Sequence, residues 1–300
     1  MKHVLVSGGT GLVGRYIVEE CLAAGFSVTV AGRTRPAEDL FYSKVGFRPL
    51  TLDPDRDQTA IFDGIDIFVH AAFQHVSGRY RGGEGDDPEG FIRQNRDGTI
   101  ALFRAARRAG INRALFLSSR AVYDGYPAGT ELSESMTPEP ESLYGKVKWE
   151  AEQAIAELAA PGFVPTSLRA TGVYGDLSPN KWHDLFERYM KGEPVAARAG
   201  SEVHGRDLAR AVLTVAAAPV YKVSGKAFNV SDIVTDTRAI LSPLKSAIAG
   251  SRPLPERGDH ESVSVMTTAK LNALGWRTGG IPLFDATLEA LISDFLGRRS

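Results

Sequence analysis

Cysteine is almost missing from this sequence. Cys21 is the single cysteine among 300 residues, so no disulfide can form within the chain. No signal peptide precedes the apolar run that begins at His3. Both features favour a reducing environment, and we expect a cytoplasmic protein.

An excess of charge of either sign is also missing. The 35 Lys and Arg residues balance 36 Asp and Glu residues, which leaves a net charge of -1 at neutral pH. A protein that binds the phosphate backbone of a nucleic acid needs clustered positive charge, and this chain has no excess of it. We therefore expect no nucleic-acid partner. No apolar run approaches the roughly 20 residues that cross a bilayer, and no basic block flanks an apolar stretch, so we expect no membrane partner either.

What is present is the composition of a globular protein. Hydrophobic residues make up 43% of the chain and charged residues 24%, a balance that excludes disorder. Strand-like runs alternate with stretches of helical periodicity, which predicts an α/β fold with a Rossmann-type, doubly wound parallel sheet. The expected strands are His3–Ser7, Ser27–Ala31, Ile65–His70, Arg113–Ser118, Val164–Leu168 and Ala227–Val230. The expected helices are Leu12–Ala24, Pro88–Ala109, Ser142–Ala160, Lys181–Lys191, Asp207–Ala218, Asp236–Ala249 and Leu283–Leu296.

The regular alternation weakens after Leu168, where Pro and Gly separate the later helices. This change predicts a smaller C-terminal substrate lobe over the carboxyl edge of the sheet, where open α/β sheets bind ligands. The segments 34–62 and 74–87 lack periodicity, and the second, rich in glycine and charge, is typical of a mobile surface loop. We assign to the dinucleotide-binding core residues 1–168 and about 204–233, and to the lobe about 169–203 and 234–300.

A glycine-rich turn stands between the first strand and the first helix. Gly8, Gly11 and Gly14 allow, in order, a tight turn, close approach of the backbone to a pyrophosphate, and close packing of helix on strand. A plain tight turn is the alternative, but the flanking strand and helix favour dinucleotide binding. The cofactor contacts expected from this turn are Gly8, Thr10, Gly11, Leu12, Val13 and Gly14.

The residues after the second strand predict which dinucleotide binds. An acid about 20 residues past the glycines binds the free ribose of NAD, whereas Arg binds the 2′-phosphate of NADP. This segment contains Arg33 and Arg35, and the first carboxylate after them is Glu38. Solvated surface arginines are the plain alternative. Because guanidinium forks suit phosphate, we predict NADP, with NAD as the alternative.

Three further residues have the pattern of a proton-transfer site. Tyr144 and Lys148 lie four residues apart at the start of a predicted helix, so both side chains project from one face. A neighbouring ammonium and a cationic nicotinamide favour the phenolate, which can exchange a proton with a substrate oxygen. Ser119, at a strand end, can donate a hydrogen bond to that oxygen. Each residue alone has a plain structural explanation, but together, after the glycine turn, they predict a catalytic set.

The whole series of motifs is found in one known family. The motifs are GGTGLVG at 8–14, VHAA at 69–72, NRDGT at 95–99, LSSRAVY at 117–123, YGKVK at 144–148, LRATGVYG at 168–175, FNV at 228–230 and LGW at 274–276. With them the chain resembles the extended short-chain dehydrogenase/reductase family of the NAD(P)-dependent epimerase/dehydratase type, from residue 3 to about 295.

The resemblance implies roles for individual residues. Tyr144 would be the acid/base, Lys148 would hold the nicotinamide ribose and favour the phenolate, and Ser119 would polarise the substrate carbonyl. The family also suggests a homodimer through the helices that begin near Pro88 and Ser142. The further cofactor contacts that it implies are Leu52, Asp53, His70, Ala71, Ala72, Ser118 and Val173.

Departures from the family pattern concern the substrate. Gly172 stands where sugar-nucleotide members often have Asn, and Glu256 stands where they have an Arg that grips a diphosphate, with Arg257 beside it. We predict no metal site. The substrate contacts that we predict are Phe73, Ser119, Gly172, Lys181, Trp182, His183 and Arg257.

Three functions are compatible with this pattern. We predict first an NADP-dependent oxidoreductase that interconverts a hydroxyl and a carbonyl on a small polar, sugar-like substrate, with Tyr144 moving the proton. The alternative is a nucleotide-sugar epimerase or dehydratase that retains NAD(P). The third, a non-enzymatic NADP-sensing protein, is disfavoured because such sensors typically lose the Tyr and Lys pair.

Overall fold

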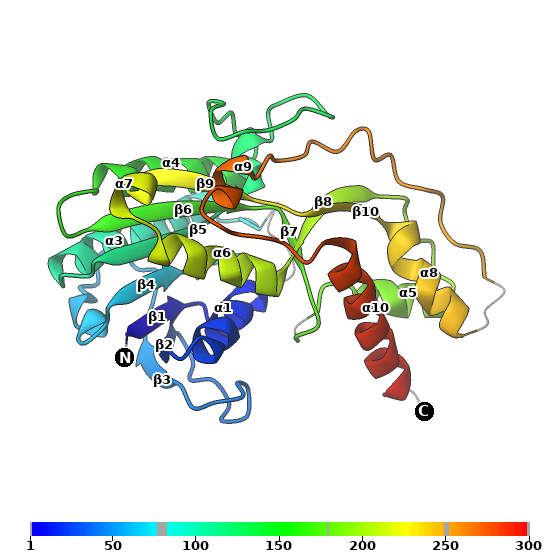
Figure 1. The fold of residues 1–300 in the computed structure, drawn as a ribbon, viewed down its shortest axis with the longest axis horizontal. Coiled ribbons are helices and arrows are strands. Elements are labelled where there is room, and N and C mark those ends of the chain that lie inside the picture. The colour runs from blue at the N-terminus through cyan, green and yellow to red at the C-terminus, as the bar shows by residue number, and fades with distance from the viewer. Residues whose placement is uncertain (1, 77–82, 179, 249–251, 299–300) are drawn as a thin grey trace.

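The computed structural model describes residues 2–76, 83–178, 180–248 and 252–298. Its strands form two sheets, of which the larger has seven strands in the order β3-β2-β1-β4-β5-β6-β9 (Figure 1). Every neighbouring pair in this sheet is parallel. Its strands are β1 (His3–Ser7), β2 (Ser27–Gly32), β3 (Gly46–Pro49), β4 (Ile67–His70), β5 (Arg113–Ser119), β6 (Val164–Ala170) and β9 (Lys226–Val230).

Helices cover both faces of the large sheet. On one face, α1 (Leu12–Ala23) and α6 (Gly205–Ala217) share a hydrophobic cluster with side chains of β1 and β5. On the other face, α3 (Thr99–Arg108) and α4 (Leu143–Glu157) share a second cluster with the alternate side chains of the same strands. The central strands are apolar and buried because both of their faces are covered. The chain is therefore a Rossmann-type doubly wound protein, which confirms the predicted fold class.

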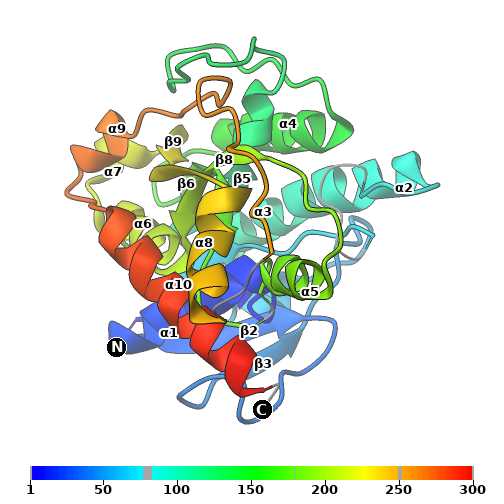
Figure 2. The ribbon, with the colours of Figure 1, turned by 90° about the vertical axis from the view of Figure 1, so that its right-hand side faces the viewer.

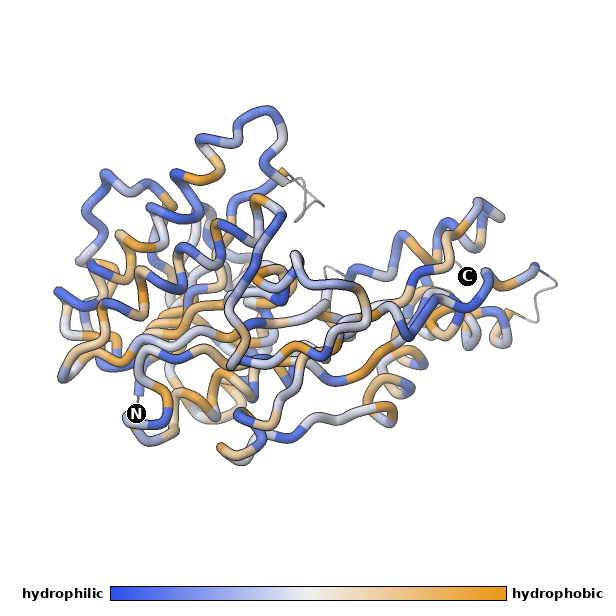
Figure 3. The backbone as a smooth tube through the Cα atoms, turned by 90° about the horizontal axis from the view of Figure 1, so that it is seen from above, coloured by the Kyte–Doolittle hydropathy of each residue, from blue (hydrophilic) through white to orange (hydrophobic). Residues whose placement is uncertain are grey.

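A smaller lobe follows the carboxyl ends of β6 and β9 (Figure 2). Its sheet has three strands in the order β10-β8-β7, and its side chains form a separate hydrophobic cluster that includes Tyr174, Phe186, Leu241 and Leu288. Seen from above, the N-terminus lies in the core and the C-terminus in this lobe (Figure 3). The elements of the lobe are β7 (Gly172–Tyr174), β8 (Ala199–His204), β10 (Ile233–Asp236), α5 (His183–Lys191), α8 (Thr237–Ala247) and α10 (Gly280–Gly297).

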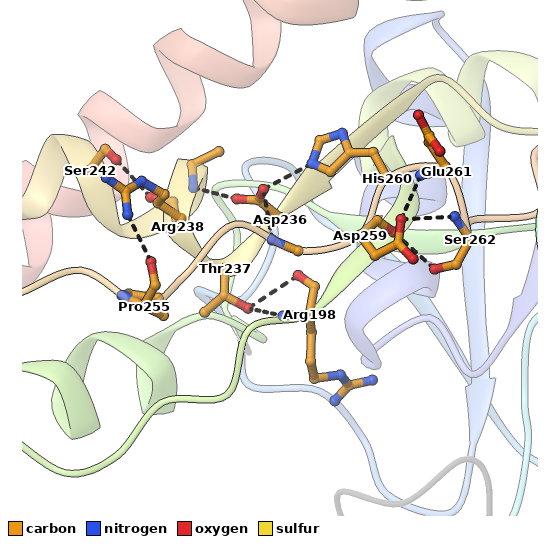
Figure 4. A network of polar contacts seen from close by, with 12 residues as sticks. Arg198, Asp236, Thr237, Arg238, Ser242, Pro255, Asp259, His260, Glu261 and Ser262 are labelled. Atoms are coloured by element: carbon orange, nitrogen blue, oxygen red, sulfur yellow. Dashed lines mark hydrogen bonds and ion pairs between the residues drawn. The ribbon is translucent and has the colours of Figure 1, made fainter.

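Residues 252–268, which we call the return segment, run from the lobe back to the core (Figure 1). At the lobe, Asp236 accepts hydrogen bonds from the backbone N–H of Ala239 and Gly258, and its carboxylate lies 2.9 Å from Nε2 of His260 (Figure 4). At the core, Met266 forms a parallel bridge with Leu132. The return segment thus fastens the lobe to the core.

The predicted long helix at 88–109 is three shorter elements in the structure. A π-helical turn, η2 (Arg93–Gly98), separates α2 (Pro88–Ile92) from α3. At its end the backbone passes so close to Leu52 that a Cβ on Gly98 would lie 2.3 Å from the Leu52 carbonyl oxygen. The other short elements are η1 (Thr59–Phe62), η3 (Arg120–Tyr123), α7 (Val220–Val223) and α9 (Ala269–Asn272).

Four strands were not expected from the sequence, namely β3, β7, β8 and β10. β3 has no buried position and includes Gly46 and Pro49, so it gives no apolar signal. The predicted helix at 181–191 begins at His183, and the one at 236–249 spans Thr237–Ala247. Part of the predicted mobile loop at 74–87, residues 77–82, lies outside the described residues.

Candidate active site

A cavity of about 1280 Å³ runs along the carboxyl edge of the large sheet and reaches the lobe. It is lined by the segments that follow β1, β2, β3, β4, β5 and β6, and by lobe residues that include Lys181 and Arg198. Pockets for one drug-sized ligand mostly measure about 300–1,000 Å³. The cavity therefore has room for a dinucleotide together with a small second molecule.

The glycine turn forms one end of this cavity. Gly8 has a φ of +71°, and a Cβ there would lie 2.7 Å from the Ala72 backbone. A Cβ on Gly14 would lie 2.1 Å from the Gly8 carbonyl oxygen, so the third glycine is what allows α1 to pack on the turn. Gly11 caps α1 without any side-chain hydrogen bond and the first turn has no acidic residue. Backbone N–H groups at such a helix start suit a pyrophosphate.

The predicted 2′-phosphate region lies at the end of β2. Arg33 lines the cavity, whereas Arg35 places its guanidinium 5.1 Å from the centre of the Phe47 ring and does not line it. Asp53 also lines the cavity, and its carboxylate accepts a hydrogen bond of 3.2 Å from Arg93. Of the predicted pair, Arg33 is therefore the arginine that faces the cavity.

His70 lies beneath the cavity and is fully buried. Its Nδ1 is 2.6 Å from the Ser7 hydroxyl, and its Nε2 is 2.9 Å from the Thr99 hydroxyl. Burial, together with the nearby charge of Lys148, lowers the pKa of His70 to about 3, so the ring is neutral at physiological pH. Its two hydrogen bonds hold the end of β4, from which Ala71 and Ala72 line the cavity.

The predicted catalytic residues Ser119, Tyr144 and Lys148 all line the same cavity. Ser119 ends β5, and its hydroxyl accepts a hydrogen bond of 3.1 Å from the backbone N–H of Ala121. Tyr144 and Lys148 project from the first two turns of α4, whose start packs against η3: a Cβ on Gly145 would lie 2.3 Å from the Ala121 carbonyl oxygen. This close approach of α4 to the segment after β5 brings the three residues to one cavity.

Lys148 is a buried cation. Its Nζ donates a hydrogen bond of 2.7 Å to the Leu117 carbonyl and lies 4.5 Å from the centre of the Phe73 ring. Burial lowers the pKa of Lys148 to about 7, while the charge of Glu152 acts in the opposite direction. The Phe73 ring also packs edge-on against Tyr144, with ring centres 5.1 Å apart, so it orients both side chains.

A buried polar atom without a partner also faces this region. Ser118 lines the cavity and is 5% exposed, and its hydroxyl has no hydrogen-bond partner within the described part of the chain. Buried polar groups are normally satisfied, so this hydroxyl is suited to a bound ligand. The orphaned hydroxyl and the glycine turn together fit a dinucleotide.

The predicted substrate residues divide into two groups. Lys181, Gly172 and Phe73 line the cavity. Trp182 instead stacks on Tyr174 inside the lobe, with ring centres 5.1 Å apart. His183 lines a separate pocket of about 170 Å³, and Arg257 is exposed away from both pockets.

The sequence did not indicate several residues that line the cavity. Some, such as Gly32 and Ala121, adjoin predicted residues and could have been inferred from them. The lining residues that were not predicted are Gly32, Leu50, Thr51, Gln74, His75, Arg93, Gln94, Leu117, Arg120, Ala121, Ala170, Thr171 and Leu208.

Among the described residues, no group of three or more His, Cys, Asp or Glu is arranged to hold a metal ion. No described helix is long and apolar enough to cross a membrane.

The fold and the cavity are those of an enzyme of the extended short-chain dehydrogenase/reductase class. The profile of the NAD dependent epimerase/dehydratase family matches residues 4–231, and the chain belongs to this family. The predicted resemblance is thus confirmed.

Individual relatives agree with this assignment. The UDP-glucose 4-epimerase of Rhizobium leguminosarum bv. trifolii is 26% identical over 95% of this chain and 94% of its own. The 3 beta-hydroxysteroid dehydrogenase/Delta 5→4-isomerase of Mycobacterium tuberculosis is 31% identical over 64% of this chain and 52% of its own. The structure of UDP-glucose 4-epimerase from Thermus thermophilus in complex with NAD superimposes with a TM-score of 0.77 at 27% identity, covering 98% of this chain and 99% of that one.

Proposed function

We propose that the protein is an NADP-dependent oxidoreductase that interconverts a hydroxyl and a carbonyl on a small polar substrate. The observation that carries this proposal is the presence of Ser119, Tyr144 and Lys148 in the same cavity as the glycine turn. We also propose that residues 1–168 and about 204–233 hold the cofactor, and that the remaining lobe residues hold the substrate.

The chain's own residues would divide the chemistry as follows. A bound nicotinamide supplies or accepts the hydride. The Tyr144 hydroxyl gives a proton to the substrate oxygen in reduction and takes one in oxidation, while Ser119 donates a hydrogen bond to the same oxygen. Lys148, in its protonated form, favours the phenolate and donates to a ribose hydroxyl. The glycine turn and Ser118 hold the rest of the dinucleotide.

NADP is the cofactor that the chain's own residues favour. Arg33 lines the cavity at the end of β2, and the one acidic residue among the cavity's described lining residues, Asp53, already accepts a hydrogen bond from Arg93. A guanidinium at this position binds a 2′-phosphate well. NAD remains the alternative, since the Thermus thermophilus structure is a complex with NAD.

A nucleotide-sugar epimerase is the second candidate, because the Rhizobium leguminosarum relative matches over nearly its whole length. One experiment separates the two functions. The purified protein is incubated with NADPH and a panel of polar carbonyl compounds, and separately with UDP-glucose and no added cofactor. The proposal expects net NADPH consumption in the first arm. Inversion of the sugar in the second arm, with no NADPH consumed in the first, would establish the epimerase instead.

A further inference from the structure

A buried ion pair lies one helical turn beyond the candidate catalytic lysine. Glu152 follows Lys148 by four residues on α4, and residues with this spacing project from the same face of a helix. Glu152 and its partner on β6, Arg169, are each 4% exposed, and Lys148 is 5% exposed. Three ionisable side chains are therefore buried between α4 and the large sheet.

Arg169 fixes the carboxylate of Glu152. Its Nη2 donates a hydrogen bond of 2.7 Å to Oε2 of Glu152, and its Nε lies 3.0 and 3.2 Å from the two carboxylate oxygens. Its Nη1 donates to the hydroxyl of Tyr123, and the Tyr123 ring centre lies 4.9 Å from the guanidinium carbon. Because its donors are engaged on both sides, Arg169 holds the carboxylate in one orientation.

The ammonium of Lys148, in contrast, is surrounded by neutral groups. It donates a hydrogen bond of 2.7 Å to the Leu117 carbonyl. Three aromatic ring centres lie 4.5, 4.7 and 5.9 Å from it, those of Phe73, Phe116 and Tyr144. Aromatic faces attract a cation, but they replace only part of the hydration that a buried ammonium loses. A charge enclosed in this way needs an anion nearby.

The other ionisable groups on the elements around Lys148 are neutral, paired with each other or exposed. His70, at the end of β4, is neutral at physiological pH. On η2, Arg96 forms ion pairs with Asp97 and with Glu150, which lies on the exposed face of α4. The arginines of α3 are all exposed, namely Arg104, Arg107 and Arg108.

Glu152 is thus the source of negative charge for this region. Among the described residues, it is the charged group that raises the pKa of Lys148 against the effect of burial. Its ion pair with Arg169 keeps Glu152 ionised at a depth where a lone carboxyl would hold its proton. The pair therefore places a lasting negative charge one turn from the ammonium.

We propose that Glu152 is the counter-ion of the Lys148 ammonium and that Arg169 holds it in place. Both are positioning residues, because Lys148 lines the cavity and neither of them does. The inference rests on the proposed function, in which the protonated Lys148 favours the Tyr144 phenolate and donates to a ribose hydroxyl. It gives a role in the reaction to a charge pair that lies too deep to touch a ligand.

The test measures the proton affinity of Lys148 directly. Protein that contains isotope-labelled lysine gives an NMR titration curve for the Cε of each lysine, and the Lys148 curve is the one missing from Lys148→Met. In the wild type the pKa of Lys148 should be about 7. In Glu152→Gln, which keeps the size of the side chain, the midpoint should fall by about one pH unit or more, because the ammonium loses its counter-ion.

Matched variants separate charge from packing. Glu152→Asp keeps the negative charge and should restore most of the wild-type midpoint. Glu150→Gln makes the same chemical change two residues away, in a partly exposed ion pair with Arg96, and should leave the midpoint unchanged. If Glu152→Gln folds poorly because Arg169 is left unpaired, Glu152→Gln/Arg169→Met removes both charges. It should still lower the midpoint, since Glu152 is the member of the pair that acts on Lys148.

Binding of NADP gives a second measurement that a merely structural role would not move. The protonated Lys148 donates to the ribose in the proposed site, so the NADP dissociation constant should rise as the pH increases through the Lys148 midpoint. In Glu152→Gln this rise should begin at a lower pH, by the same interval as in the NMR titration. Below both midpoints the two proteins should bind NADP equally, whereas a damaged site would bind it more weakly at every pH.

The inference is overturned if the Lys148 midpoint is unchanged in both Glu152→Gln and Glu152→Gln/Arg169→Met, or if it falls equally in Glu150→Gln. A failure of the proposed function looks different, because the NMR titration needs neither cofactor nor substrate. In that case no carbonyl compound consumes NADPH, while the Lys148 midpoint still depends on Glu152.

Discussion

The ammonium of Lys148 donates a hydrogen bond to the carbonyl oxygen of Leu117, 2.7 Å away, at a position that solvent hardly reaches. Burying a charge costs free energy, which is why the pKa of Lys148 is lowered from 10.5 to about 7. Perturbed groups of this kind occur mostly where chemistry needs them. The folded protein therefore carries a destabilising charge at its candidate active site.

Lys148→Met should stabilise the protein and abolish its turnover. The folded state binds fewer protons than the unfolded state between pH 10.5 and about 7. The loss in the free energy of unfolding that the buried Lys148 ammonium causes is therefore largest below about pH 7 and vanishes as the pH rises toward 10.5. Urea unfolding near pH 6 should show a gain of about 2 kcal/mol in the free energy of unfolding. A gain of the same size near pH 10, or a loss near pH 6, would contradict this account.

Tyr144→Phe should remove catalysis and leave cofactor binding intact. The change deletes the oxygen that moves the proton and keeps the ring that packs against Phe73. We expect turnover to fall by roughly a hundredfold or more, with the NADPH dissociation constant nearly unchanged. Stopped-flow rates and fluorescence titration measure the two quantities. Retention of most of the wild-type rate would assign proton transfer to another group.

Arg33→Asp should reverse the cofactor preference. A carboxylate at the end of β2 repels a 2′-phosphate and accepts hydrogen bonds from free ribose hydroxyls. Wild-type protein should bind NADPH more tightly than NADH, and the variant should bind NADH more tightly. Arg35→Asp is the matched control, because Arg35 lies over Phe47 and outside the cavity. A wild type that prefers NADH would refute the role of Arg33 and leave the fold assignment untouched.

His70 should make stability fall at mildly acidic pH. Its folded-state pKa of about 3 lies below the value of 6.5 for an unperturbed ring. The unfolded state therefore takes up a proton first, and stability present above pH 6.5 is lost as the pH falls toward 3. Between pH 6.5 and 5 the free energy of unfolding should fall by about 2 kcal/mol from this cause. Urea unfolding of His70→Gln at these two pH values should show a free energy of unfolding that falls by about that much less than in the wild type. The same pH dependence in both proteins would refute this role of His70.

The core and the glycine turn were predictable because their signals are local. Buried parallel strands appear as apolar runs, and Gly8, Gly11 and Gly14 mark the turn where backbone must approach closely. The order of these signals was enough to predict a doubly wound sheet. Ser119, Tyr144 and Lys148 could be brought together as candidates in the same way, since each stands at the end or start of a regular element, and all three line one cavity.

The lobe was less predictable because its residues are placed by contacts between distant segments. β8 reads Ala-Gly-Ser-Glu-Val-His, which has neither alternation nor an apolar run. Glu202 gains its position from the register of β8 with Gly172, and this register is not encoded near either residue. Trp182 and Lys181 are adjacent in sequence, yet Trp182 packs inside the lobe and Lys181 lines the cavity.

The return segment has a consequence for how the lobe can change. The hydrophobic cluster of the lobe is assembled from stretches around Tyr174, Leu241 and Leu288. Between Tyr174 and Leu241 the chain passes through the core, and between Leu241 and Leu288 it contacts the core again. No continuous piece of chain contains the lobe, so it cannot be cut out and joined to another protein as a recombining module. Changes to the lobe in this architecture have to be made within its separate stretches of chain.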